Sequence, residues 1–179
     1  MSTRRSFIVA AAAGAAGLVF TGARSLSAEQ SGRKLNKDDM AFVLKAGEGG
    51  DAEVALGKLA ETNGYGTEVK AFRKRMVDDH TKANEELISI AKDKDVQLSH
   101  ELKGDTKEMY DKLAGLNGPE FDKHYIEHMV KGHEETVELF KKEAESGTDA
   151  KLKEFAGKTL PVIEQHLALA KEISAKVGA

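Results

Sequence analysis

Each long amphipathic segment of this sequence carries one ionisable residue within its apolar face. The four residues are Glu53, His80, His133 and His166. Three imidazoles and one carboxylate are ligand types that proteins use to bind Zn²⁺, Cu²⁺ or Fe²⁺. A buried carboxylate is costly, by several kcal/mol, unless it is paired, so Glu53 is expected to face an imidazole. These four residues are the predicted metal-binding set.

Other uses of these histidines also fit their positions. The four residues could form a buried hydrogen-bond network that fixes helix register and binds nothing. A dinuclear iron site of the ferritin type requires Glu-x-x-His on two helices, but Val77, Val130 and Ile163 precede the histidines by three positions. Such an iron-oxidising site is therefore disfavoured. His124 and His128 have the spacing of a chelating pair on a polar flank, and they form a weaker candidate.

Four segments with helical periodicity must position the predicted site. The first starts at Asn36 or Asp38 and ends near Glu61, and the others span about 67–92, 119–145 and 149–176. Glycine-rich turns join them in pairs, and a short helix over 105–113 interrupts the long connection between the second and the third. A rise of about 1.5 Å per residue brings the four ionisable residues to similar heights. We predict an all-α four-helix bundle.

Small residues surround Glu53 on the first of these helices. Ala46, Gly50, Gly57 and Ala60 fall on the same stripe of the helical wheel. Each glycine costs roughly 1 kcal/mol in a helix interior relative to alanine, so another group is expected to need the space. We expect imidazoles from the other helices to occupy it.

The first 28 residues have the pattern of a cleaved export signal. Arg4 and Arg5 precede a 13-residue apolar run that ends at Phe20, and small residues follow it. This run is shorter than the roughly 20 residues of a membrane span. The twin arginine is typical of the pathway that exports folded proteins. We predict a signal peptide over 1–28, a flexible linker over 29–37, a bundle domain over 38–177 with no membrane span, and periplasmic localisation.

Composition narrows the classes of partner and chemistry. The chain has 27 basic and 30 acidic residues. Three of the basic residues lie in the predicted signal, which leaves the mature part near −6. No basic stripe is present, which argues against nucleic acid as a partner. There is no cysteine, which excludes disulfides, thiol chemistry and a cysteine-linked lipid anchor. The sequence contains no nucleophile motif and no phosphate-binding glycine loop, so no such motif indicates an enzyme.

Several short stretches along the chain form a recognisable set. They are Asp39–Phe42, Gly49–Gly50 with Glu53–Ala60, Val69–Phe72 with Met76–His80, Phe121–Asp122, Tyr125–Ile126, Met129–Val130 with His133, and Leu160–Pro161 with His166–Leu167. Together they resemble the bacterial family called domain of unknown function 4142. The resemblance covers about residues 36–175. It implies an exported, ferritin-like bundle of the bacterial envelope, in which residues 93–118 cross over and the second and third long helices run parallel. It implies no activity.

Two functions therefore remain open on the sequence alone. The first is an exported protein that binds a metal ion or small ligand through Glu53, His80, His133 and His166. The second is a non-enzymatic envelope or stress-related interaction protein whose buried Glu/His network is only structural. An oxidoreductase built on the bound metal is a weaker third option. Separations of about 3–4 Å between the side-chain heads would indicate a shared ion, whereas separations beyond about 8 Å would indicate separate contacts.

Overall fold

The computed structural model describes residues 34–177, so the predicted export signal and most of the predicted linker lie outside the described part of the chain. Five helices and no strand form within it. They are α2 (Lys37–Asn63), α3 (Thr67–Asp93), α4 (Gly104–Ala114), α5 (Gly118–Ser146) and α6 (Ala150–Val177). The predicted all-α fold is confirmed. None of these described helices is both long enough and apolar enough to cross a membrane.

The helices begin and end close to the predicted positions, because capping residues mark their ends. Asn36 caps α2, and its side-chain oxygen accepts a hydrogen bond from the Asp39 N–H at 2.7 Å. Gly64 and Gly147 follow the last residues of α2 and α5, and the N–H of each bonds a carbonyl four residues earlier. Pro119 lies in the first turn of α5, where a missing N–H leaves no bond unmade.

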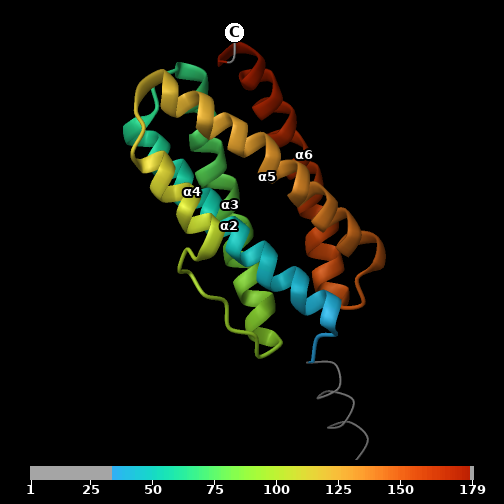
Figure 1. Ribbon diagram of the computed structural model, residues 1–179. Helices are drawn as coiled ribbons and strands as arrows, with labels where there is room; N and C mark the ends of the chain where they lie inside the picture. The colour runs from blue at the N-terminus through green and yellow to red at the C-terminus, as the bar shows by residue number, and fades with distance from the viewer. Residues whose placement is uncertain (1–33, 178–179) are drawn as a thin grey trace, which may run out of the picture. The chain divides into compact units, whose positions relative to one another are not determined.

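The four long helices form two antiparallel hairpins, α2–α3 and α5–α6, which pack against each other (Figure 1). Helix α2 contacts α5, and α3 contacts α6. Residues 94–117 connect the hairpins and carry the short helix α4, which packs on α2 and α5. As a result α3 and α5 run in the same direction.

Two buried aspartates join the hairpins at opposite ends. Asp39 in the first turn of α2 accepts hydrogen bonds at 3.0 Å from both backbone N–H groups of residues 148–149, and one at 2.6 Å from the Thr148 hydroxyl. Asp122, near the start of α5, accepts bonds from the N–H groups of residues 65–66 at 3.0 and 2.6 Å. The two aspartates lie 83 positions apart in the chain, and so do the two turns. Each hairpin therefore caps the turn of the other.

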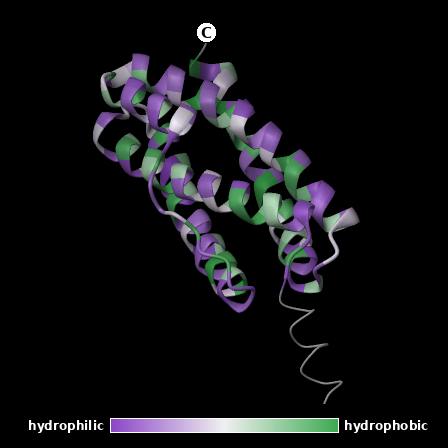
Figure 2. Ribbon diagram, turned by 60° about the horizontal axis from the view of Figure 1, so that its bottom comes forward, coloured by the Kyte–Doolittle hydropathy of each residue, from purple (hydrophilic) through white to green (hydrophobic). Residues whose placement is uncertain are grey.

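The apolar core consists of two clusters with a polar layer between them. Hydrophobic and hydrophilic residues are interspersed along the helices (Figure 2). On α3, Met76 belongs to one cluster and Leu87 to the other, and the buried His80 lies between them. His133 on α5 and His166 on α6 occupy the same intermediate position on their helices. The predicted site residues thus interrupt the core at one level.

The glycines of α2 allow a close approach of α3. A Cβ atom on Gly50 would overlap the Asn84 side-chain oxygen. A Cβ atom on Gly57 would lie 2.6 Å from Val77 Cγ2 and 3.3 Å from the Arg73 carbonyl oxygen. All three neighbours belong to α3, and none is an imidazole. The prediction that these glycines make room for the histidines is wrong, because helix–helix contact uses that space.

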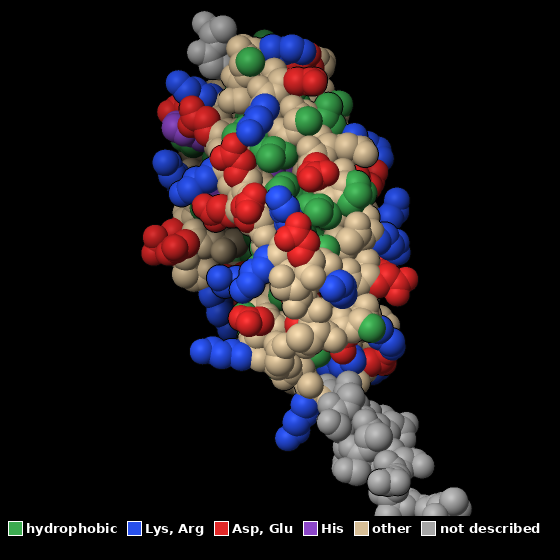
Figure 3. All heavy atoms as spheres, turned by 90° about the vertical axis from the view of Figure 1, so that its right-hand side faces the viewer, with side chains coloured by type: hydrophobic (Ala, Val, Ile, Leu, Met, Phe, Trp, Pro, Cys, Tyr) green, Lys and Arg blue, Asp and Glu red, His purple; other side chains and the backbone are tan. Residues whose placement is uncertain are grey.

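Charged side chains of both signs cover the helix surfaces. Acidic and basic groups are interspersed on the face shown in Figure 3, with hydrophobic side chains between them. Ion pairs link neighbouring helices, for example Lys158 with Glu86 at 2.8 Å and Lys171 with Glu134 at 2.7 Å. Exposed pairs of this kind contribute about 0–1 kcal/mol each. The core and the two aspartate caps therefore dominate the arrangement of the helices.

Candidate metal site

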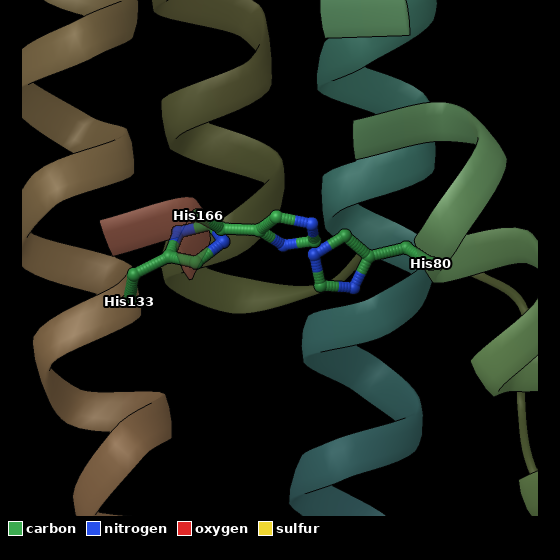
Figure 4. A group of neighbouring side chains, drawn as sticks. All are labelled: His80, His133 and His166. Atoms are coloured by element: carbon green, nitrogen blue, oxygen red, sulfur yellow. The ribbon is translucent and has the colours of Figure 1, made fainter. Parts of the chain in front are cut away.

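Three of the four predicted site residues meet in the polar layer. His80, His133 and His166 each offer one ring nitrogen, and these nitrogens all lie within 4.8 Å of one another. The ring centroids form a nearly equilateral triangle with sides of 5.7, 5.4 and 5.6 Å. Figure 4 shows the three rings converging from separate helices. Within residues 34–177 this is the one group of three metal-ligating side chains so close together.

The triangle is close to the size that a shared metal ion requires. An ion about 2.0–2.1 Å from each nitrogen lies about 3.2 Å from each ring centroid, so the centroids would be about 5.2–5.5 Å apart. The observed sides are 5.4–5.7 Å, so even the widest exceeds this range by only a few tenths of an ångström. The nitrogens would be about 3.3–3.6 Å apart around such an ion. The nitrogens, which lie within 4.8 Å of one another, would have to approach by up to about 1.5 Å to share an ion.

Hydrogen bonds occupy one nitrogen of His133 and one of His166, and one buried nitrogen of each of the three rings has no partner. His133 Nδ1 lies 2.8 Å from the Met129 carbonyl oxygen, which can only accept, so Nδ1 carries the proton. His166 Nε2 lies 3.0 Å from Asp79 Oδ2, so Nε2 carries the proton there. The remaining nitrogens, Nε2 of His133, Nδ1 of His166 and Nε2 of His80, are buried and unpartnered. At least two of the three therefore present lone pairs.

Asp79 and Met129 orient two of the rings from behind. A carboxylate or backbone carbonyl bound to the outer nitrogen is the usual support of a metal-ligating histidine. Arg75 holds Asp79 in turn, with Nε 3.4 Å from Oδ2, and also donates a 2.7 Å bond to Gln165 of α6. Burial opposes ionisation of Asp79, but the hydrogen bonds from His166 and Arg75 outweigh it and lower its pKa.

The surroundings keep the three imidazoles uncharged. Burial, together with the neighbouring His133 and His166, lowers the pKa of His80 to about 3. Burial lowers the pKa of His166 to about 4 even though Asp79 opposes this shift. Burial also lowers the pKa of His133. Near neutral pH the rings are therefore in the neutral form that binds metal ions.

Glu53 lies beside the triangle. Its Oε1 is 3.7 Å from His133 Nδ1, the nitrogen already bonded to the Met129 carbonyl, and its Oε2 is buried without a partner. Burial raises the pKa of Glu53 to about 7, while His128 acts in the opposite direction. The structure thus brings Glu53 to the protonated edge of one ring, and the converging nitrogens come from the three histidines.

A cavity of about 830 Å³ between α2 and α5 reaches the site. Of the three histidines His80 lines it, together with Glu53. Apolar side chains such as Phe140 and Phe155 form part of its wall, and charged residues of both signs from α2, α4 and α5 also line it. Gly132 of α5 also lines the cavity, and a Cβ atom there would lie 3.8 Å from Glu53 Oε1. His80 and Glu53 therefore border a space large enough for a small molecule.

The weaker predicted pair, His124 and His128, has separate surroundings. His124 Nδ1 lies 3.4 Å from Glu127 Oε2, whereas His128 lines the cavity near Glu53. Burial lowers the pKa of His128, and Glu53 opposes that shift. Neither residue belongs to the group of converging ligands.

Comparison with known proteins places most of the chain in one family. The sequence model of the family described as Domain of unknown function (DUF4142) matches residues 24–173. This range contains all three converging histidines, Glu53 and both aspartate caps. Comparisons with curated proteins and with solved structures gave no significant match.

Proposed function

Because the chain belongs to this family, whose function is unknown, we propose a function from the site itself: the protein binds one divalent transition-metal ion through His80, His133 and His166. The convergence of three buried, unpartnered ring nitrogens carries this proposal. A buried polar atom without a partner costs about 1–3 kcal/mol, and one shared cation would satisfy all three atoms. Imidazole ligands suit Zn²⁺, Cu²⁺ and Fe²⁺, the ions considered from the sequence.

A purely structural role accounts for less of the geometry. A hydrogen-bond network that only fixes helix register would use both nitrogens of a buried ring, because unsatisfied polar atoms are destabilising. Here His133 and His166 each donate one hydrogen bond to a group outside the triangle, and no ring is hydrogen-bonded to another. The outward bonds support the rings in the way expected for metal ligands.

The proposal also includes the localisation of the protein and the type of bundle that holds the site. The export pattern of residues 1–28 supports twin-arginine export to the periplasm, where the protein could associate with the envelope. The parallel α3 and α5 and the crossover of residues 94–117 support a ferritin-like four-helix bundle. The missing Glu-x-x-His motif favours a single ion over the dinuclear ferritin centre.

Metal titration of the purified full-length protein tests this function. We expect one equivalent of Zn²⁺, Cu²⁺ or Co²⁺ to bind the chelator-treated protein. Free metal at 1,000 times Kd adds about 4 kcal/mol to the free energy of unfolding, which raises Tm by on the order of 10 °C in a domain of this size. The His124→Ala variant should respond equally. A wild-type Tm that is insensitive to all three ions would exclude the proposed function.

Asp79 should affect metal affinity without being a ligand. We expect Asp79→Asn to weaken metal binding about 10–100-fold, because it removes the carboxylate that holds His166. Asp78→Asn is the matched control, since Asp78 is half exposed and pairs with Lys74 at 2.6 Å on the surface. Competition with a coloured chelator measures both affinities. Equal affinities of the two variants would contradict the orienting role of Asp79.

A further inference from the structure

Three protein ligands leave a metal ion with an open coordination position. Structural zinc sites have four protein ligands, whereas catalytic zinc sites have three and keep the fourth position for water or substrate. Among the described side chains the converging group contains three histidines. Glu53 lies next to the outer nitrogen of His133, away from the nitrogen that faces the other rings. An ion held by the three histidines would therefore have a coordination position that none of the converging side chains fills.

The α2–α5 cavity borders the triangle at His80. It has a volume of about 830 Å³, within the range of about 300–1,000 Å³ that is typical of small-molecule sites. His80 connects the cavity to the triangle, and Glu53 Oε2 adds a buried hydrogen-bonding atom without a partner. No other ring of the triangle lines the cavity, so a ligand would approach from the side of His80.

The cavity wall indicates the chemical class of the ligand. Phe140, Phe155, Leu87 and Ile163 supply apolar surface, and they belong to or contact the same core cluster. A ligand that fits has a metal-binding donor atom at one end and an apolar or aromatic body. Such a body would bury apolar surface at roughly 25 cal/mol per Å².

We propose that the metal ion bound by the three histidines takes as its fourth ligand a small molecule held in the α2–α5 cavity, with a nitrogen or oxygen donor head and an apolar body. This inference rests on the proposed metal binding. It adds an exchangeable ligand and a route of access, which a closed, purely structural metal site would lack.

Cobalt(II) gives a direct test, because its visible absorption spectrum changes with its ligands. The full-length protein loaded with Co²⁺ is titrated with azide, which fits any open position, and with 4-phenylimidazole, which adds an aromatic body. We expect both to change the spectrum. Gly132→Leu should narrow the cavity beside Glu53 and weaken 4-phenylimidazole binding at least 10-fold, with Co²⁺ affinity unchanged within about 3-fold.

Two further variants make the comparison specific. Gly157→Leu also replaces a helical glycine, but Gly157 is exposed on α6 outside the cavity, so its 4-phenylimidazole affinity should equal that of the wild type. Gly49→Phe places a side chain in open space at the cavity wall, and it serves as a second blocking variant if Gly132→Leu does not fold.

The outcomes separate this inference from the function on which it rests. Stoichiometric Co²⁺ binding with a spectrum that neither azide nor 4-phenylimidazole alters would overturn the open position and leave metal binding intact. Equal 4-phenylimidazole affinities in the blocking and control variants would overturn the cavity as the route. Failure of the wild type to bind Co²⁺ would overturn both proposals.

Discussion

Replacing His80 with leucine is expected to stabilise the metal-free protein and to remove most of its response to metal. His80 is buried, its Nε2 has no hydrogen-bond partner, and it lies between two apolar clusters. Leucine has a similar size and carries no polar atom. Removing one unsatisfied buried atom should raise the free energy of unfolding by about 1–3 kcal/mol.

The metal-dependent part of this prediction has the opposite sign. Structural zinc sites with four ligands bind with about 10–16 kcal/mol, or about 3 kcal/mol per ligand, so loss of His80 should weaken binding at least about 100-fold. Urea unfolding with and without Zn²⁺ measures both effects. His124→Leu is the control and should change neither, because His124 is partly exposed and pairs with the exposed Glu127. A destabilised metal-free His80→Leu protein would indicate that the ring supports the core.

Replacing Asp122 with alanine is expected to destabilise the protein by about 2–4 kcal/mol. The carboxylate is 3% exposed and accepts two backbone N–H bonds from the α2–α3 turn. Hydrogen bonds to charged groups contribute about 1.5–3 kcal/mol each, and part of this loss is recovered because Tyr65 is exposed to water. The free energy of unfolding in urea gives the measurement.

A neighbouring acid provides the control for Asp122. Glu120 lies in the first turn of the same helix but is exposed, so Glu120→Ala should cost less than about 1 kcal/mol, the limit of its interaction with the helix dipole. Asp39→Ala should resemble Asp122→Ala, because Asp39 makes three corresponding bonds at the other turn. Equal stabilities of the Asp122→Ala and Glu120→Ala variants would show that the cap is not important.

Local rules were sufficient to predict the helices and the meeting of the histidines. Caps and apolar periodicity gave ends within one or two residues of those observed, as for the helix predicted over 67–92 and found at Thr67–Asp93. The heights of His80, His133 and His166 followed from the rise per residue and the short turns. Helix ends and heights depend on residues that are close in the sequence, so a single sequence is enough to predict them.

The residues whose roles the sequence does not reveal depend on partners in other helices. Asp79 precedes His80 on α3, and its bond to His166 of α6 spans 87 positions of the chain. Gly50 and Gly57 indicated that another group needs the space, but the wheel did not show that α3, and not the imidazoles, would fill it. Asp122 is an ordinary acid near a helix start until the turn at residues 65–66 is placed beside it. In each case, the rotation of one helix relative to its neighbour determines which residues meet.

The exchange of caps between the hairpins has a consequence for how the protein folds. Neither hairpin contains the acceptor for its own turn, so an isolated α2–α3 or α5–α6 unit would leave those N–H groups to water. Partial structures with one hairpin formed are thereby disfavoured, and unfolding should be all-or-none. His80 belongs to one hairpin, and His133 and His166 belong to the other, so a bound ion would hold the two hairpins together. Metal occupancy would then set the rate at which the hairpins separate.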